Sequence, residues 1–402
     1  MTTYIIISLC VLTLLAYIFD LSGKRTRVPG VILLMLLGII VRQAAELFTF
    51  AIPNLRPALP VIGTVGLILI VLEGSLDLEL RREKLPLIGR TLFAAIVLLV
   101  LCSLAFAALF TVLFGSPWLP SLVNAIPLGI ISSAIAISGV FHLAPERREF
   151  VVYESTFSDI IGILFFNFLV MNEEYGITTI AGFVVQIGSV LLISAAASFG
   201  LGMLLQRITH HVKVIPIIAI LLLLYSIAKK MDLPSLVLVM AFGLFLNNLR
   251  LLDLHWSPVR IIRGLIDPSR IAGELVPFKH LVAEVTFVVR SFFFIMFGYY
   301  TDVRSLADPS SLMVAFTIAG FVLVTRALYF RITRIDAGAV LFVAPRGLIT
   351  ILLFLSIPAS MRIPGINEGL LTQVIFISAF VMMAGLMNES GPDRRFAVSH
   401  ST

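Results

Sequence analysis

Long apolar segments alternate with short polar loops along most of the chain. A helix that crosses a bilayer needs roughly 20 mostly apolar residues, and fewer when it is interrupted and enclosed by protein. On this template the hydropathy pattern predicts an all-α polytopic membrane protein with about thirteen spans. The expected ranges are 3–20, 29–47, 59–77, 88–114, 122–143, 150–170, 176–205, 213–229, 234–247, 280–300, 309–330, 336–357 and 368–387.

The positive charges between these segments predict an orientation. An odd number of spans places the termini on opposite sides, and Lys and Arg concentrate in cytoplasmic loops. With the N-terminus outside and the C-terminus in the cytoplasm, most basic residues fall inside. The outside loops then hold Arg42, Arg56, Lys229, Lys230, Arg304 and Arg362. This asymmetry favours a multi-pass protein of the plasma membrane.

Composition excludes several other classes of protein. The chain is 59% hydrophobic and 13% charged, whereas soluble domains are about 25% charged. Its net charge of +6 comes from residues between apolar runs, so no nucleic acid partner is expected. Cys10 and Cys102 lie inside apolar runs, and no HExxH, GxGD or GxSG pattern indicates an enzyme or a cofactor.

The order of the spans predicts one transmembrane domain over residues 1–402, without an appended soluble domain. Secondary transporters often contain two inverted repeats with interrupted helices at matching positions. Ranges 3–170 and 213–387 would form such repeats, with 176–205 as a linker helix. The connection 248–279 is expected to be a basic amphipathic helix at the lipid headgroups.

The fifth span of each expected repeat carries helix-breaking residues. The first reads "AIPLGIISSAIAIS" and the second reads "VAPRGLIT". Proline leaves a carbonyl without its amide partner, so the freed backbone and nearby hydroxyl groups can replace part of an ion's hydration shell. The residues concerned are Pro127, Gly129, Ser132 and Ser133 in the first span, and Pro345, Arg346, Gly347 and Thr350 in the second.

Two acids stand in the sixth span, in "YESTFSDIIGILFFN". Residues four apart share a helix face, so Ser155 faces the same way as Asp159, and Glu154 the same way as Ser158. We expect Asp159 to bind a monovalent cation or a proton. Glu154 is expected to form a structural ion pair with an intramembrane arginine. The alternative is that both acids simply pair with arginines.

Further charges within the apolar runs are also candidates. Arg290 and Arg346 are the expected partners of Glu154, and Glu73 is either a second ligand or an interfacial acid. Arg326 and Glu284 are interpreted as boundary residues. Because burial disfavours the charged form of a carboxylate, a cation and a proton would compete for the same buried acid.

The motif "ESTFSD" resembles the "ESxxND" signature of the NhaP-like branch of monovalent cation/proton antiporters. "APRGLITILLFLSIP" and the two interrupted spans resemble the same family. The resemblance implies crossed discontinuous helices, a dimerisation domain, a mobile core that moves as an elevator, and a homodimer. It also implies that Asp159 is the exchanging carboxylate and that Ser155 and a group near Ser132 are ligands.

The chain departs from that family at two places. Ser158 stands where the family has asparagine, and the family's "TDP" corresponds to Ser132, Ser133 and Ala134. Because the second acid is absent, we expect electroneutral exchange of one cation for one proton. Sodium is the expected cation and lithium a further candidate. Potassium/proton exchange at the same site and an uncoupled channel-like pathway remain the alternatives.

Overall fold

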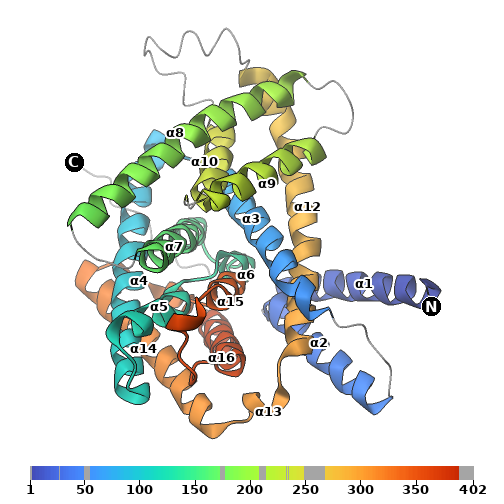
Figure 1. The fold of residues 1–402 in the computed structure, drawn as a ribbon, viewed down its shortest axis with the longest axis vertical. Helices are drawn as coiled ribbons and strands as arrows, with labels where there is room; N and C mark the ends of the chain where they lie inside the picture. The colour runs from blue at the N-terminus through green and yellow to red at the C-terminus, as the bar shows by residue number, and fades with distance from the viewer. Residues whose placement is uncertain are drawn as a thin grey trace. The chain divides into compact units, whose positions relative to one another are not determined.

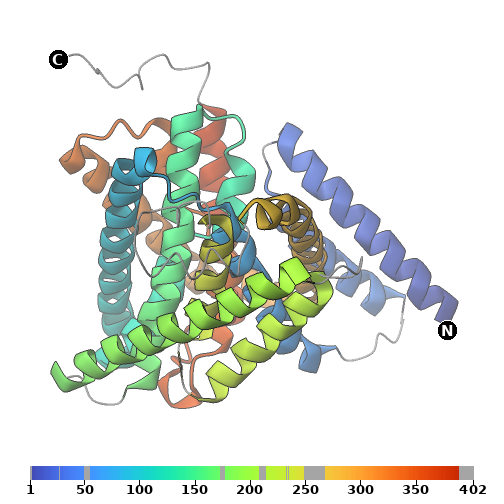
Figure 2. The same ribbon diagram turned by 90° about the horizontal axis from the view of Figure 1, so that it is seen from above.

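The computed structural model describes residues 2–26, 28–48, 55–172, 177–207, 214–231, 233, 235–248 and 268–388. Within these ranges the chain is helical and contains no strand, as Figures 1 and 2 show in two views. The all-α architecture expected from hydropathy is therefore confirmed. Residues 249–267, which make up most of the expected headgroup helix, lie outside the described part of the chain.

The helices follow the hydropathy pattern closely. Each of the predicted ranges overlaps one helix or one interrupted pair of helices, and the number that cross a membrane stays a prediction. The α-helices are α1 (Thr2–Thr26), α2 (Gly30–Leu47), α3 (Leu59–Asp77), α4 (Leu85–Phe114), α5 (Trp118–Gly129), α6 (Ser133–Gly139), α7 (Pro145–Met171), α8 (Ile177–Arg207), α9 (Val214–Lys230), α10 (Ser235–Asn248), α12 (Pro268–Tyr300), α13 (Val303–Leu306), α14 (Pro309–Thr333), α15 (Leu348–Leu355) and α16 (Glu368–Met387). The short 3₁₀ helices are η1 (Arg56–Ala58), η2 (Arg82–Lys84), η4 (Gly338–Phe342) and η5 (Ala359–Met361).

Eight helical segments of the described chain are long and apolar enough to cross a membrane. One of them, Trp118–Gly139, contains the interruption between α5 and α6. The second interrupted segment, formed by η4 and α15, is too short in each part to qualify by length. The two breaks occur in the predicted fifth spans, although the inverted repeat itself stays a prediction.

The chain forms two compact units. Unit 1 contains Met1–Pro60, Gly89–Gly162 and Ser291–Thr402, and unit 2 contains Val61–Ile88 and Ile163–Arg290. Both units draw on both halves of the sequence, so they do not coincide with the expected repeats. In unit 2, α10 packs against α8 and α9.

Unit 1 holds both interrupted helices. In this unit α14 packs against α16 and η4, and α15 packs against α5 and α16. Helices α2 and α12 approach so closely that a Cβ on Gly38 or Gly298 would overlap backbone of the opposite helix. Small residues allow such close backbone packing of helices in membranes. Gly38 and Gly298 therefore let α2 and α12 pack backbone to backbone.

Candidate functional site around Asp159

The first interruption lies between α5 and α6. Ile130 (φ −72°, ψ 134°) and Ser132 (φ −73°, ψ 113°) are extended instead of helical. Pro127 lies in the last turn of α5 and Gly129 ends that helix. The break is buried throughout, so every amide that it releases needs another acceptor.

Three amides released by the break find acceptors outside their own helix. In an unbroken helix the amides of residues 131, 132 and 133 would donate to carbonyls four residues earlier. Instead, Ile131 N donates to Ser158 Oγ at 3.0 Å, and Ser133 N donates to Asp159 Oδ2 at 3.2 Å. Ser132 N donates to the Pro345 carbonyl at 2.8 Å. The break is therefore held jointly by α7 and by the second interrupted helix.

The second interruption lies between η4 and α15, and Gly347 is its last residue before α15. A Cβ on Gly347 would overlap the Ser132 side chain. The two breaks therefore meet at Ser132, which contacts Pro345 and lies against Gly347. We call this meeting point of the two interrupted helices the crossing. Figure 1 shows α5, α6 and α15 gathered at this place.

Asp159 lies on α7 beside this crossing and is 4% exposed. Its Oδ2 accepts the Ser133 amide. Its Oδ1 has no hydrogen-bond partner among the described residues. Because a buried carboxylate oxygen without a partner is costly, Oδ1 has room in its hydrogen bonding for a proton, a cation or a water molecule.

The neighbouring serines of α7 have backbone partners. Ser155 is buried, and its hydroxyl donates to the Val151 carbonyl at 2.7 Å. Ser158 accepts the Ile131 amide, so it orients the break that lies beside Asp159. The roles of Ser132, Ser133, Ser155 and Ser158 as ion ligands stay predictions.

Glu154 forms the buried ion pair that the sequence predicts, but with a different arginine. Arg326 of α14 contacts it with both terminal nitrogens, at 2.7 Å to Oε1 and 3.1 Å to Oε2. Both side chains are 1% exposed. The expectation of Arg290 or Arg346 as partner was wrong, as was the interpretation of Arg326 as a boundary residue.

Arg326 also holds the segment that leads into the second break. Its Nε donates to the Leu341 carbonyl at 3.1 Å, and a terminal nitrogen donates to the Val340 carbonyl at 2.8 Å. Both carbonyls belong to η4. One buried arginine therefore ties together α14, η4 and the acid of α7. The signal for it was an arginine inside the expected span 309–330, since an arginine within an apolar span normally has a partner.

Arg346 replaces the hydrogen bond that α5 loses at its end. The Leu128 carbonyl would accept from Ser132 N in a continuous helix, but that amide donates to Pro345. Arg346 Nε donates to the Leu128 carbonyl instead, and a terminal nitrogen donates to the Ala344 carbonyl at 2.6 Å. A cation is favourable at a helix C-terminus, so Arg346 serves the crossing and not Glu154.

The remaining predicted residues lie in unit 2. Glu73 on α3 and Arg290 on α12 are both partly buried. Glu73 as a second cation ligand stays a prediction. Groups of three or more His, Cys, Asp or Glu that could hold a metal ion do not occur among the described residues.

Comparison with known proteins identifies the family. A family model described as sodium/hydrogen exchanger, transmembrane, matches residues 10–387. The chain is similar to a structure of the sodium proton antiporter MjNhaP1 from Methanocaldococcus jannaschii at pH 8, with a TM-score of 0.65, 17% identity and 96% of each chain covered. It is also similar to a 3D EM map of that antiporter, with a TM-score of 0.64 and 15% identity, over 98% of this chain and 100% of that chain. A search among curated proteins found no match.

These likenesses confirm the predicted antiporter fold. The family consists of transporters and not of enzymes, and its substrates are the transported ions. The chain belongs to the sodium/hydrogen exchanger family and is a multi-pass membrane protein that exchanges a cation for protons.

Proposed function

We propose that this antiporter exchanges sodium for protons at Asp159. The observation that carries the proposal is the buried Asp159 carboxylate, with one oxygen held by the Ser133 amide and the other unpartnered among the described residues. The family description supports sodium as the cation. Lithium is a smaller ion of the same charge and the expected second substrate.

Competition at one carboxylate accounts for coupling. A proton and a sodium ion each neutralise Asp159, and each excludes the other. Moving an uncompensated charge through a low-dielectric interior is costly. The protein therefore changes between its outward- and inward-facing states when Asp159 binds either ligand, and rarely does so when Asp159 is charged and empty. Exchange then follows from the chemistry of a single acid.

The charges at the crossing support electroneutral exchange of one sodium ion for one proton. Asp159 is the acid at the meeting of the breaks, and Ser132 and Ser133 stand where the related family carries a second acid. Glu154 does not add to the transported charge because it is neutralised by Arg326. An elevator-like movement of the core carrying the crossed helices would alternate access to Asp159.

Three further properties belong to this proposal. The protein resides in the plasma membrane with its N-terminus outside and its C-terminus in the cytoplasm, as the charge distribution between spans favours. It forms a homodimer, as the NhaP-like resemblance implies. Ser155 adds a hydroxyl oxygen to the coordination of the cation.

The first prediction concerns Asp159→Asn. This variant keeps the size of the side chain but cannot release a proton, so sodium-driven proton movement should fall to the rate of empty vesicles. The measurement uses proteoliposomes with an internal pH-sensitive dye and gradients of sodium, lithium or potassium in turn. Ser138→Ala is a matched control, since that hydroxyl bonds carbonyls of its own short helix.

Native exchange in Asp159→Asn would refute the assignment. A higher rate with potassium than with sodium would favour the potassium/proton alternative. Reversing the sodium gradient should reverse the proton flux, whereas an uncoupled channel would let each ion follow its own gradient.

A further inference from the structure

A second buried arginine joins α7 to the segment that leads into the second break. Arg147 lies in the first turn of α7, and its side chain is 2% exposed. A terminal nitrogen of Arg147 donates to Asp336 Oδ2 at 3.2 Å, and the Asp336 side chain is 66% exposed. Asp336 belongs to the short connection between α14 and η4. The pair therefore links the start of α7 to the start of η4.

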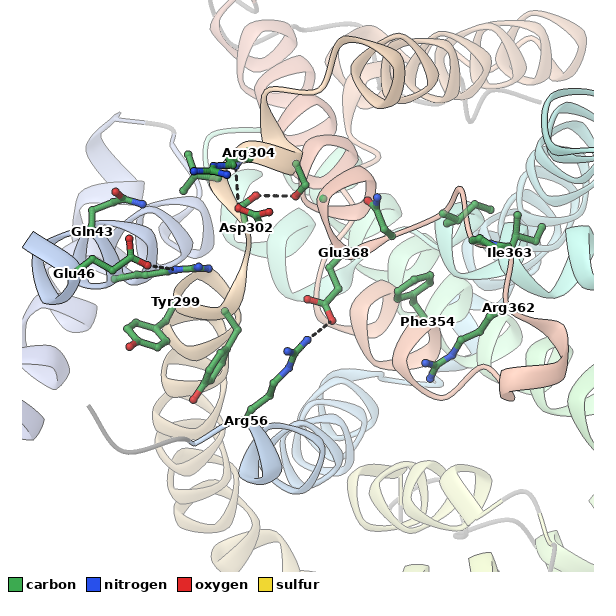
Figure 3. Close-up of a pocket in the computed structure, with 18 residues that line it drawn as sticks. Gln43, Glu46, Arg56, Tyr299, Asp302, Arg304, Phe354, Arg362, Ile363 and Glu368 are labelled. Carbon is green, nitrogen blue, oxygen red and sulfur yellow. Dashed lines mark hydrogen bonds and ion pairs between the residues drawn. The ribbon is translucent and has the colours of Figure 1, made fainter. Parts of the chain in front are cut away.

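The place of Arg147 in the helix is unfavourable for a cation. The macrodipole of a helix favours anions at the N-terminus, and a buried guanidinium also loses its hydration. The pair of Arg56 and Glu368, drawn in Figure 3, shows the contrast: at 3.7 Å, with side chains 66% and 35% exposed, water still solvates both groups. Arg147 depends instead on contacts with the protein to compensate its charge.

Gly338, the first residue of η4, lies directly against this guanidinium. A Cβ on Gly338 would overlap the terminal atoms of the Arg147 side chain. Gly338 also has a φ of +47°, which L side chains rarely adopt. Both the space and the backbone therefore require glycine here, and the guanidinium occupies the place that a side chain would take.

Helix α7 thus holds η4 at two points. Arg147 and Glu154 are seven positions apart, so they share a face of α7 and lie about 10 Å apart along its axis. Arg147 contacts Gly338 at the start of η4, whereas Glu154 pairs with Arg326, which donates to two carbonyls of η4. The two ion pairs have opposite orientation. Sliding the α14–η4 segment along α7 would therefore bring Asp336 toward Glu154 or Arg326 toward Arg147, and like charges repel.

The position of η4 sets the position of the second break. Phe342, the last residue of η4, precedes Pro345 by three residues, and the Pro345 carbonyl accepts the Ser132 amide at 2.8 Å. On its other side η4 packs against α16, where a Cβ on Gly385 would overlap the Phe342 ring. A displacement of η4 would therefore move the Pro345 carbonyl away from Ser132.

We propose that Arg147 is a positioning residue for cation exchange, which holds η4 at the place where Pro345 reaches Ser132. Arg147 precedes Asp159 by twelve residues, about 18 Å along α7, so it acts through η4 and not as an ion ligand. The inference rests on the proposed function only in that the crossing carries the exchange site. It applies to whichever cation is exchanged, and part of its test requires no transport.

The test compares Arg147→Gln with Arg148→Gln. Both variants remove one positive charge near the start of α7, but the Arg148 side chain is exposed and lies over the Phe141 ring, 4.8 Å from its centroid. Arg147→Lys keeps the charge, and Asp336→Asn removes the partner. The full chain is used throughout. Hydrogen–deuterium exchange of residues 338–347 is followed by mass spectrometry in detergent, and the apparent KM for the exchanged cation is measured in proteoliposomes.

We expect Arg147→Gln to raise the apparent KM about tenfold, which is the order of one lost hydrogen bond between charged groups. Deuterium uptake in residues 338–347 should become faster, while uptake in α2 stays native. Arg147→Lys should recover part of both properties. Asp336→Asn should change both in the same direction as Arg147→Gln, and the double variant should be no worse than Arg147→Gln alone, because both residues act through one contact. Arg148→Gln should change neither.

Several results would overturn the role of Arg147. They are a native KM in Arg147→Gln, an equal change in Arg148→Gln, or faster uptake over the whole chain instead of in residues 338–347. A native chain that exchanges no cation would refute the proposed function, while the uptake of residues 338–347 still decides whether Arg147 holds η4. If Arg147→Gln fails to fold, Arg147→Lys and Asp336→Asn supply the result.

Discussion

The two acids of α7, Asp159 and Glu154, differ in the groups that their carboxylate oxygens contact. Asp159 keeps one oxygen unpartnered among the described residues, which suits an exchanging group. Glu154, five positions earlier on the same helix, has both oxygens occupied by Arg326. Of the two carboxylates, only Glu154 is neutralised by an arginine, so it serves as a structural brace, while Asp159 is the one that we propose to bind the ion.

The buried ion pair of Glu154 and Arg326 predicts how substitutions at these two positions change folding stability. Glu154→Ala leaves a buried guanidinium uncompensated, which costs about 3–5 kcal/mol, so we expect a large loss of folded yield and a lower Tm. Replacing both partners, as in Glu154→Leu with Arg326→Met, should recover much of that loss because no buried charge is left unpaired. Sodium affinity of the protein that folds should stay near native.

The control is Glu46→Ala, whose carboxylate is 60% exposed and pairs with Arg42. Its Tm should change little, since such pairs contribute about 0–1 kcal/mol. Thermal stability in detergent and sodium-dependent exchange are measured together. Normal yield of Glu154→Ala with a large loss of sodium affinity would show that Glu154 binds the ion.

Ser158 carries a second prediction at this scale. Ser158→Ala removes the acceptor of the buried Ile131 amide, and an unsatisfied buried donor costs about 1–3 kcal/mol. We expect a higher apparent KM for sodium, because the displaced segment carries the Ser133 amide that donates to Asp159. Ser158→Asn, which restores a side-chain acceptor, should retain exchange. Equal KM values in Ser158→Ala and the native chain would contradict this role.

At the scale of elements, the site depends on two interrupted helices that meet. The first break is not satisfied within its own helix, since its released amides donate to α7 and to Pro345 of the second break. Arg346 donates to the Leu128 carbonyl, which lacks its helical donor because of the first break. The two breaks stabilise each other, so a change in one should be reversible by a change in the other.

Gly347 and Ser132 test this dependence. A Cβ on Gly347 would overlap the Ser132 side chain, so Gly347→Ala should separate the breaks and reduce exchange strongly. Adding Ser132→Gly makes space and should restore part of the rate. Gly320→Ala is the control, because a Cβ there meets no atom within 4 Å. If the double variant exchanged no faster than Gly347→Ala alone, steric contact would not be the cause.

At the scale of the whole molecule, the proposed exchange at Asp159 predicts how transport depends on pH and voltage. As pH falls, a larger share of Asp159 is protonated, so sodium binds more weakly. For one-for-one competition the apparent KM for sodium rises about tenfold for each pH unit below the pKa of the site. The maximal rate should be unchanged by a membrane potential, since no net charge moves.

Both properties are measured in the same proteoliposomes, with sodium titrations at several pH values and a potassium diffusion potential set by valinomycin. A rate that follows the imposed potential would contradict one-for-one exchange. A KM for sodium that is independent of pH would show that the proton and the cation use different groups.

The sequence by itself determined the membrane class, the helical segments, the position of both breaks and the separation of Glu154 and Asp159 onto different faces of one helix. These are local properties, because hydropathy, proline, glycine and helical periodicity act over a few turns. The tertiary structure decided the partners: Arg326 for Glu154, Ser158 for the Ile131 amide, and Arg346 for the end of α5. Glu154 and Arg326 lie 172 positions apart, and no local pattern specifies which buried arginine reaches which acid, since helix packing alone brings them together.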